Sequence, residues 1–174
     1  MIENELKYVL GGHAALEELL ACSGCPRKEL TSGYLNEETR IRREVSAGLD
    51  ERIFTFKRRL PDGRNIEVAR DLDAEAFSLL WSVTRERLTK RRYTLLDGSV
   101  TWDTDFFYNP CGEVYFAMAE AEMPPAMDRP ERIHPVIAPH VAFSAARGDP
   151  RFSSRLIAGE GYARNLALVL QVVA

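Results

Sequence analysis

Charged side chains recur two residues apart in six short segments, a spacing that places them on one face of a β-strand. Some of these segments carry only cations and others only anions, so the signs are sorted by strand. Arginine pairs in strands suit bidentate binding of phosphate. The segments are Glu3, Glu5 and Lys7; Arg40 and Arg42; Thr55, Lys57 and Arg59; Lys90 and Arg92; Asp103 and Asp105; and Glu120 and Glu122.

This pattern has two interpretations. On a half-buried sheet the polar residues simply face water, although soluble surfaces usually intersperse the two signs. If the polar residues instead line an antiparallel barrel, a cationic wall faces an anionic wall, which is costly unless a charged ligand lies between them. A polyphosphate with Mg²⁺ or Mn²⁺ satisfies both walls, because carboxylates hold hard cations that bridge to phosphate oxygens. The pattern indicates phosphate plus metal and does not identify the substrate.

The elements that position these residues read as an α+β fold, a barrel of antiparallel strands with helices packed outside it. Short turns such as Asp97-Gly98 imply that neighbouring strands are antiparallel. Helices are expected over 13–22, with Leu16, Leu19 and Leu20 on one face, and over 74–86, after Asp73 as N-cap. The expected strands are 2–10, 31–36, 39–46, 51–59, 64–71, 88–96, 99–108 and 113–122.

Composition excludes several classes of protein. A chain of 174 residues with 45% hydrophobic and 28% charged residues is ordinary for one globular domain. A net charge of −3 gives no global basic field, so no nucleic-acid partner is expected. The apolar tail 166–174 is far shorter than the about 20 residues of a membrane span. Because the first residues also lack a signal-peptide pattern, we expect a cytoplasmic protein.

Cysteine and histidine add little to this interpretation. Cys22 and Cys25 form a C-x-x-C pattern, but with only Cys111 besides them there is no second pair for a four-ligand zinc site. The three histidines lack ligand spacing on any expected element.

The apolar tail 166–174 either caps the outside of the barrel or forms a homodimer contact, and the sequence leaves that choice open.

The charged segments resemble, in order, those of the triphosphate tunnel metalloenzymes, or CYTH superfamily. Glu3-Asn4-Glu5-Leu6-Lys7 matches the E-x-E-x-K signature of that superfamily, at its usual place on the first strand. The resemblance covers roughly residues 1–125, and 149–158 looks like a late helical motif of the same family. The matching segments are Gly33-Tyr34-Leu35, Arg40-Ile41-Arg42, Thr55-Phe56-Lys57, Lys90-Arg91-Arg92-Tyr93, the run from Trp102 to Phe107, and Glu120-Ala121-Glu122.

The resemblance implies a closed eight-stranded antiparallel β-barrel with helices outside, in a single domain over 1–174. Its core would span about 1–125 and its C-terminal helical part about 149–174. Lys7, Arg40, Arg42, Lys57, Lys90 and Arg92 would bind triphosphate. Glu3, Glu5, Glu67, Asp103, Asp105, Glu120 and Glu122 would hold Mg²⁺ or Mn²⁺, directly or through water. Lys7 and Tyr34 would tune the protonation of the attacking water.

The chain departs from the family pattern after the turn at Pro61-Asp62-Gly63. Two acidic residues usually stand there two apart, and here Asn65 stands before Glu67. Asparagine can still orient water, so weaker metal affinity is expected rather than loss of activity. Ser154 also stands where Asn is common.

The resemblance implies a metal-dependent enzyme that hydrolyses inorganic triphosphate to diphosphate and phosphate. Only residues 36–39 separate Gly33-Tyr34-Leu35 from the arginine pair. This compact turn resembles the short bacterial triphosphatase branch, whereas class IV adenylyl cyclases and thiamine triphosphatases tend to carry an insertion there. A cyclase, another organic triphosphate hydrolase and a non-catalytic polyphosphate-binding module are the alternatives.

Replacing Lys7, Arg42 or Glu122 with Ala is expected to reduce triphosphate turnover at least ~10²-fold, because each supplies a preorganised charge in a dry site. Steady-state phosphate release measures this change. Near wild-type rates in all three variants would refute the assignment.

Overall fold

The computed structural model describes residues 2–172 and forms an α+β fold around one large antiparallel sheet. The hydrogen-bonded order is β1-β6-β5-β4-β3-β7-β8-β9-β2-β10. The strands are β1 (Ile2–Glu3), β2 (Glu5–Leu10), β3 (Arg27–Tyr34), β4 (Thr39–Ser46), β5 (Leu49–Arg59), β6 (Asn65–Asp71), β7 (Arg87–Asp97), β8 (Val100–Tyr108), β9 (Val114–Glu122) and β10 (Val141–Ser144). The helices are α1 (His13–Cys22), α2 (Ala74–Ser82), α3 (Ser154–Ile157) and α4 (Glu160–Val169), with short 3-10 helices η1 (Ala138–His140) and η2 (Pro150–Phe152).

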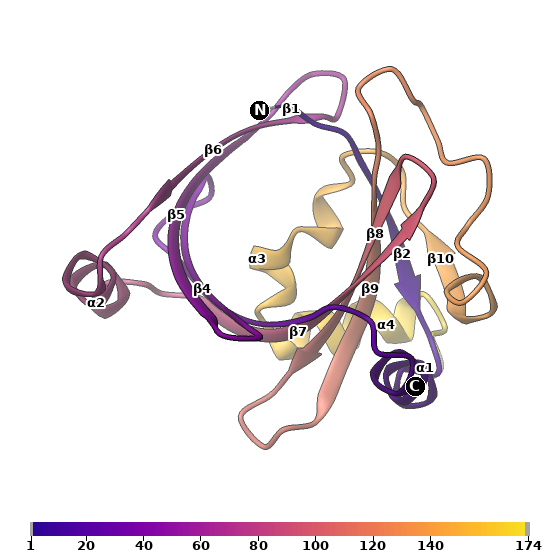
Figure 1. Cartoon of the computed structure of the whole chain (residues 1–174), viewed down its shortest axis with the longest axis horizontal. Helices are drawn as coiled ribbons and strands as arrows, with labels where there is room; N and C mark the ends of the chain where they lie inside the picture. Colours follow the sequence, from indigo (N-terminus) through magenta and orange to yellow (C-terminus); the bar gives the residue numbers. More distant parts are fainter. Residues whose placement is uncertain (1, 173–174) are drawn as a thin grey trace.

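The sheet curls into a ring in Figure 1, but it differs from the expected closed eight-stranded barrel. It has ten strands, and β1 and β10 end the hydrogen-bonded order. The N-terminal strand breaks at Asn4, so that β1 pairs with β6 while β2 pairs with β9. At this break the side-chain amide of Asn4 donates from Nδ2 to the carbonyls of Pro124 (2.8 Å) and Met127 (2.7 Å). Asn4 therefore connects β1, at one end of the sheet, to β2, which lies next to β10 at the other end.

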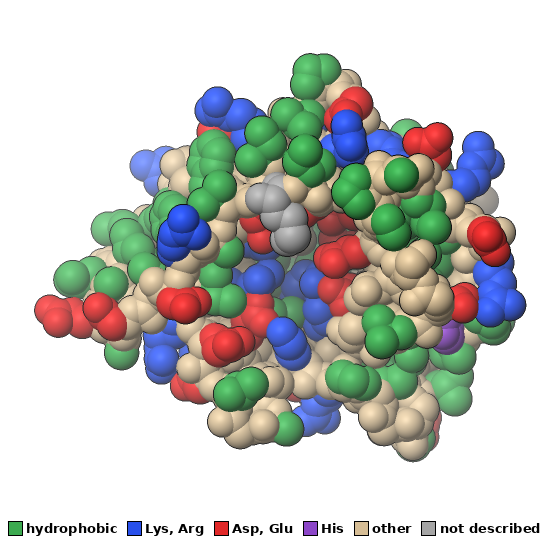
Figure 2. All heavy atoms as spheres, turned by 45° about the horizontal axis from the view of Figure 1, so that its top comes forward, with side chains coloured by type: hydrophobic (Ala, Val, Ile, Leu, Met, Phe, Trp, Pro, Cys, Tyr) green, Lys and Arg blue, Asp and Glu red, His purple; other side chains and the backbone are tan. Residues whose placement is uncertain are grey.

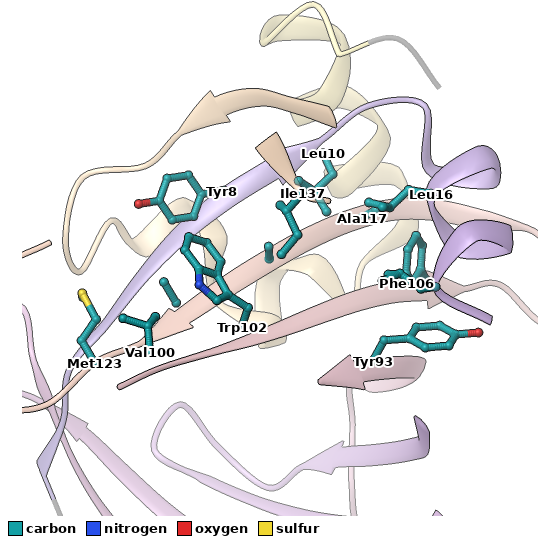
Figure 3. Close-up of a cluster of buried hydrophobic side chains, with 13 residues drawn as sticks. Tyr8, Leu10, Leu16, Tyr93, Val100, Trp102, Phe106, Ala117, Met123 and Ile137 are labelled. Atoms are coloured by element: carbon teal, nitrogen blue, oxygen red, sulfur yellow. The ribbon is translucent and has the colours of Figure 1, made fainter. Parts of the chain in front are cut away.

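Strands β8 and β9 are buried on both faces, which separates two hydrophobic clusters. On the outer face, Trp102, Phe106 and the small alanines of β9 pack under α1 and the segment that precedes β10 (Figure 3). Tyr8 lies against Trp102 with ring centroids 5.4 Å apart. On the inner face, Phe107 and its neighbours pack against α3 and α4. Alternate apolar side chains of β8 and β9 thus pack on the α1 side and on the side of the C-terminal helices.

The helices only partly follow the expected external arrangement. Helix α1 has its expected bounds and buries Leu16 and Leu20, but Leu19 is 49% exposed and was wrongly placed on that face. Helix α2 begins at its expected cap, where Asp73 accepts from the Ala76 amide at 2.7 Å, yet it ends four residues early and buries none of its side chains. Helix α3 lies within the ring of strands in Figure 1, not outside it. No helix within residues 2–172 is both long and apolar enough to cross a membrane.

The segment before α3 meets the β5–β6 turn through two glycines. Gly148 has a φ of +67°, and a Cβ on it would lie 2.8 Å from the Cα of Gly63, which itself has a φ of +83°. A side chain on Gly148 would therefore clash with the Gly63 backbone, whereas a Cβ on Gly63 would lie 3.1 Å from Arg147, a tight contact. Strand β10 and this contact lie in residues 126–148, for which the sequence predicted no element. Of the predicted C-terminal helix, residues 173–174 lie outside the described residues.

Gly148→Ala is expected to lower the free energy of unfolding by about 3 kcal/mol, because left-handed strain is added to a backbone clash. Gly24→Ala is the matched control: its φ is +71° with open space around it, so strain alone should cost about 1 kcal/mol. Chemical denaturation measures both. Equal losses would contradict the close approach.

Candidate functional site

A cavity of about 820 Å³ lies inside the curled sheet, and we call it the central pocket. Figure 2 shows it as a hollow with Lys and Arg side chains in its depth and Asp and Glu side chains along its edge. Strands β1 to β7 and β9 contribute to its lining, together with the segment 145–156. The side chains of these strands that face the cavity include the paired charges, which agrees with the barrel interpretation of the alternation and not with the one in which they face water.

The pocket brings most of the predicted site residues together. Asp103 and Asp105 are exceptions: they do not line the cavity but lie buried next to cations that do. The predicted residues that line it are Glu3, Glu5, Lys7, Tyr34, Arg40, Arg42, Lys57, Glu67, Lys90, Arg92, Glu120 and Glu122.

Arg92 is the centre of a buried charge network on β7, β8 and β9. Its Nε donates to Asp105 Oδ1 at 2.7 Å and its Nη1 to Asp103 Oδ2 at 2.6 Å. Its Nη2 donates to Asp105 Oδ2 (2.6 Å) and Glu120 Oε2 (2.7 Å). Burial disfavours the guanidinium, but the Asp105 and Glu120 charges outweigh it and raise the pKa of Arg92. The predicted cationic and anionic walls therefore touch each other directly.

Lys7 and Lys90 extend this network on either side. The Lys7 Nζ donates to Glu120 Oε1 at 2.8 Å and to the Phe152 carbonyl at 3.2 Å. Against the effect of burial, Glu120 and Glu5 raise the pKa of Lys7. The Lys90 Nζ lies 2.5 Å from Asp105 Oδ2, and burial together with the Arg92 charge lowers the pKa of Lys90 to about 8.

Strand β4 presents cations whose donors are not all used. The Nε atoms of Arg40 and Arg42 and the hydroxyl of Tyr34 are buried and have no hydrogen-bond partner among the described residues. Burial and the Arg40 charge lower the pKa of Arg42 to about 10, although Glu44 lies 2.5 Å from its Nη2. Unused donors beside crowded positive charge are the electrostatic conditions that favour an anion.

Carboxylates also line the pocket, and one of them lies beside the β4 cations: Glu67 Oε2 is 3.7 Å from Arg40 Nη2. Partial burial and the charges of Asp103 and Glu120 raise the pKa of Glu122 to about 7. Burial also raises the pKa of Glu3; Lys57 opposes this shift and Glu67 adds to it. Such crowding of like charges is relieved by a cation, and oxygen donors suit Mg²⁺ or Mn²⁺. Yet within residues 2–172 no group of three or more Asp, Glu, His or Cys side chains is arranged to hold a metal ion.

Asn65, where the resemblance led us to expect a carboxylate, lies next to the acidic residues of the first strand. The residue is buried, pairs with Glu3 across β1 and β6, and its Nδ2 lies 3.5 Å from Glu5 Oε1. Lys57 reaches the same oxygen at 3.5 Å and also pairs with Glu3. Asn65 thus donates toward a carboxylate that a second acidic residue would repel.

Several charged residues were not predicted as site residues: Glu37, Glu38, Arg59, Asp149 and Arg155 line the pocket, and Glu44 lies beside it against Arg42. Glu44 continues the inward parity of Arg40 and Arg42, so the alternation could have found it; it bridges Arg42 and the Lys28 Nζ, which lies 2.8 Å away. Arg155 lies on α3 and reaches the pocket only through tertiary packing. No strand periodicity could have signalled it.

Comparison with known proteins supports the fold alone. The sequence matches no protein-family profile and no curated protein. The PH1819 protein of Pyrococcus horikoshii is similar in structure, with a TM-score of 0.51 and 18% identity over 72% of this chain and 80% of that one. The PH1012 protein of the same organism has a TM-score of 0.50 and 13% identity, covering 98% and 90%.

A chain of the Schizosaccharomyces pombe Mediator head module has a similar fold too. Its TM-score is 0.50 and its identity 8%, covering 80% of this chain and 89% of that one. Looser similarities, with TM-scores of 0.45 and 0.40, link the chain to proteins described as putative adenylate or adenylyl cyclases, and we rest no argument on them. Similarity at this level does not decide between functions.

Arg92→Ala is expected to lower the free energy of unfolding by about 3–5 kcal/mol, because it leaves three carboxylates buried without their shared cation. Arg91→Ala is the matched control on the outer face of β7; it pairs with Glu29 and Glu17 and should cost about 1 kcal/mol. Chemical denaturation measures both, and equal losses would contradict the central role of Arg92.

The Arg92→Ala loss should also depend on pH. In the wild type, burial raises the pKa of Glu120, but the charges of Lys7 and Arg92 outweigh it and lower that pKa. Ionised Glu120 therefore stabilises the fold fully above the pKa of a glutamate in the unfolded chain, about 4.3, and this contribution is lost as pH falls. Without the guanidinium, burial raises the carboxyl pKa values, and the variant loses stability as pH rises. The difference between the proteins should be larger at pH 8 than at pH 5.

Proposed function

We propose that this protein hydrolyses inorganic triphosphate to diphosphate and phosphate with the help of Mg²⁺ or Mn²⁺. The observation that carries the proposal is a set of buried donors on Arg40, Arg42 and Tyr34, without hydrogen-bond partners among the described residues, in a cavity that carboxylates also line. A linear triphosphate offers acceptor oxygens to these donors. The resemblance of the charged segments to the tunnel metalloenzymes supports the same conclusion.

The charge balance of the pocket favours a metal requirement. Among the described residues, as many acidic as basic side chains line it, so a bare polyanion meets little net attraction. The basic ones are Lys7, Arg40, Arg42, Lys57, Arg59, Lys90, Arg92 and Arg155, and the acidic ones are Glu3, Glu5, Glu37, Glu38, Glu67, Glu120, Glu122 and Asp149. We infer that triphosphate enters together with its divalent cations.

In the proposed mechanism the residues of this chain bind and orient the substrate. Arg40 and Arg42 neutralise the phosphate chain and absorb charge in a loose phosphoryl-transfer transition state. Because the described carboxylates form no metal site by themselves, Glu122 and Glu3 would add oxygen ligands to Mg²⁺ or Mn²⁺ that enters with the triphosphate; the metal, when bound, would neutralise phosphate oxygens and lower the pKa of a coordinated water. A P–O bond to the water oxygen forms as the bridging P–O bond breaks, and the proton that the water loses passes to a phosphate oxygen of the products. Lys7, held by Glu120, orients the water and keeps its own proton.

A second candidate function is polyphosphate binding without turnover. It is favoured by the pairing of Asp103, Asp105 and Glu120 with Arg92, since carboxylates engaged by a guanidinium are not available to a metal. Binding would then occur through the β4 cations alone.

The proposal predicts EDTA-sensitive release of phosphate from inorganic triphosphate. We would assay inorganic triphosphate, ATP and thiamine triphosphate side by side with Mg²⁺, Mn²⁺ or EDTA, and would follow cyclic AMP in the ATP reactions. Fast release from triphosphate alone is the expected result. Formation of cyclic AMP would assign a cyclase instead, and metal-independent binding without release would assign the binding module.

A further inference from the structure

Arg155 is a cation of the central pocket that lies outside the charged strands. It projects from the short helix α3, and 27% of its side chain is exposed. Its Nη1 lies 3.2 Å from Glu86 Oε1 and its Nη2 lies 3.3 Å from Glu37 Oε1. Glu37 lies in the β3–β4 turn and Glu86 directly before β7, so three separate parts of the chain meet at this guanidinium.

These two ion pairs are weak compared with others in the molecule. Each is a single, long hydrogen bond to a separate carboxylate, and the Glu37 side chain is 85% exposed. Arg92 makes bonds of 2.6–2.7 Å, and Arg58 holds Glu38 in a bidentate pair with both bonds at 2.8 Å. Exposed single ion pairs contribute little free energy. The Arg155 guanidinium can therefore exchange its partners at low cost.

The backbone that carries Arg155 is fixed, in contrast to its head group. The Tyr115 hydroxyl donates to the Ile157 carbonyl at 3.1 Å, and Ile157 is fully buried in the inner cluster. The Ser153 side chain caps α3 by accepting from the Leu156 amide. A fixed backbone that carries a weakly paired guanidinium suits the binding of an anion.

Arg155 is also tied to the end of the pocket that holds the unused donors. The Tyr34 amide donates to the Glu86 carbonyl at 3.0 Å, and the Arg85 amide donates to the Tyr34 carbonyl at 3.2 Å. Tyr34 in turn lies opposite Arg40 in the β3–β4 register. Glu86, a partner of Arg155, is therefore joined through the backbone to the residue that carries the unpartnered hydroxyl.

We propose that Arg155 is a substrate-binding residue that exchanges Glu37 and Glu86 for the terminal phosphate of a linear polyphosphate, and so favours an unesterified end. This inference rests on the proposed function and adds a specificity determinant to it. An unesterified terminal phosphate carries more charge and one more free oxygen than an esterified one. The planar fork of arginine can bind two such oxygens at once.

The first test compares Arg155→Ala with Arg155→Lys. Arg155→Ala should raise KM for inorganic triphosphate about tenfold with kcat changed less than twofold, while the inhibition constant of diadenosine triphosphate, a competitor with both ends esterified, should change less than threefold. Arg155→Lys should recover only part of the loss, because lysine keeps the charge without the fork. Arg164→Ala, which removes an exposed arginine paired with Glu160 on α4 and does not line the pocket, is the control and should leave KM unchanged.

The second test separates binding from a structural role. If Arg155 only ties α3 to the neighbouring turns, the double variant Glu37→Gln, Glu86→Gln should raise KM as Arg155→Ala does. If the two carboxylates hold Arg155 away from substrate, the same double variant should lower KM about threefold. This gain should disappear when Arg155→Ala is added, which a double-mutant cycle measures.

The outcomes distinguish this inference from the function beneath it. Wild-type protein that neither hydrolyses nor binds inorganic triphosphate with Mg²⁺, by phosphate release and calorimetric titration, overturns the proposed function and this inference with it. Wild-type hydrolysis with an unchanged KM in Arg155→Ala overturns the inference alone. Equal losses of affinity for inorganic triphosphate and for diadenosine triphosphate, which has no free end, overturn the assigned preference for a free end.

Discussion

The interior of this protein depends on one guanidinium that holds three carboxylates. Arg92 contacts Asp103, Asp105 and Glu120 with five-donor geometry that no other side chain offers. These groups come from β7, β8 and β9, which lie next to one another in the sheet. Each charge alone would make burial unfavourable, whereas together they satisfy one another. The same network fixes the register at which Lys7 and Lys90 enter the pocket.

This mutual neutralisation shapes what the pocket can bind. The charges of Lys7, Lys90, Arg92, Asp103, Asp105 and Glu120 are already paired, so a ligand there has to compete with internal ion pairs. On β3 and β4 the Arg40 and Arg42 Nε atoms and the Tyr34 hydroxyl lack partners among the described residues. The pocket is thus asymmetric, with a self-satisfied side and a side that still needs acceptors. An anion that brings its own cations fits this asymmetry better than a bare anion does.

The C-terminal segments decide the shape of the cavity. Phe152 and Ile157 join the inner faces of β2, β8 and β9 in one cluster, and the Phe152 carbonyl accepts from Lys7. The contact between Gly63 and Gly148 holds the preceding segment against the β5–β6 turn. Helices that the sequence placed outside the barrel therefore line its interior, and they bring Arg155 to the pocket.

The sequence by itself determined that the paired charges share one face of each strand, because a period of two is a local property of the chain, and its short turns indicated antiparallel neighbours. The alternation left open whether that face points to water or into a barrel. It could not determine that the N-terminal strand breaks at Asn4, that β10 adds an edge to β2, or that the opposite charges pair directly across neighbouring strands. Those features depend on register, curl and packing between residues more than a hundred positions apart, as in the contact of Lys7 with Glu120. Arg155 belongs to the same group, since only the tertiary structure carries a helix from the end of the chain into the ring formed by its beginning.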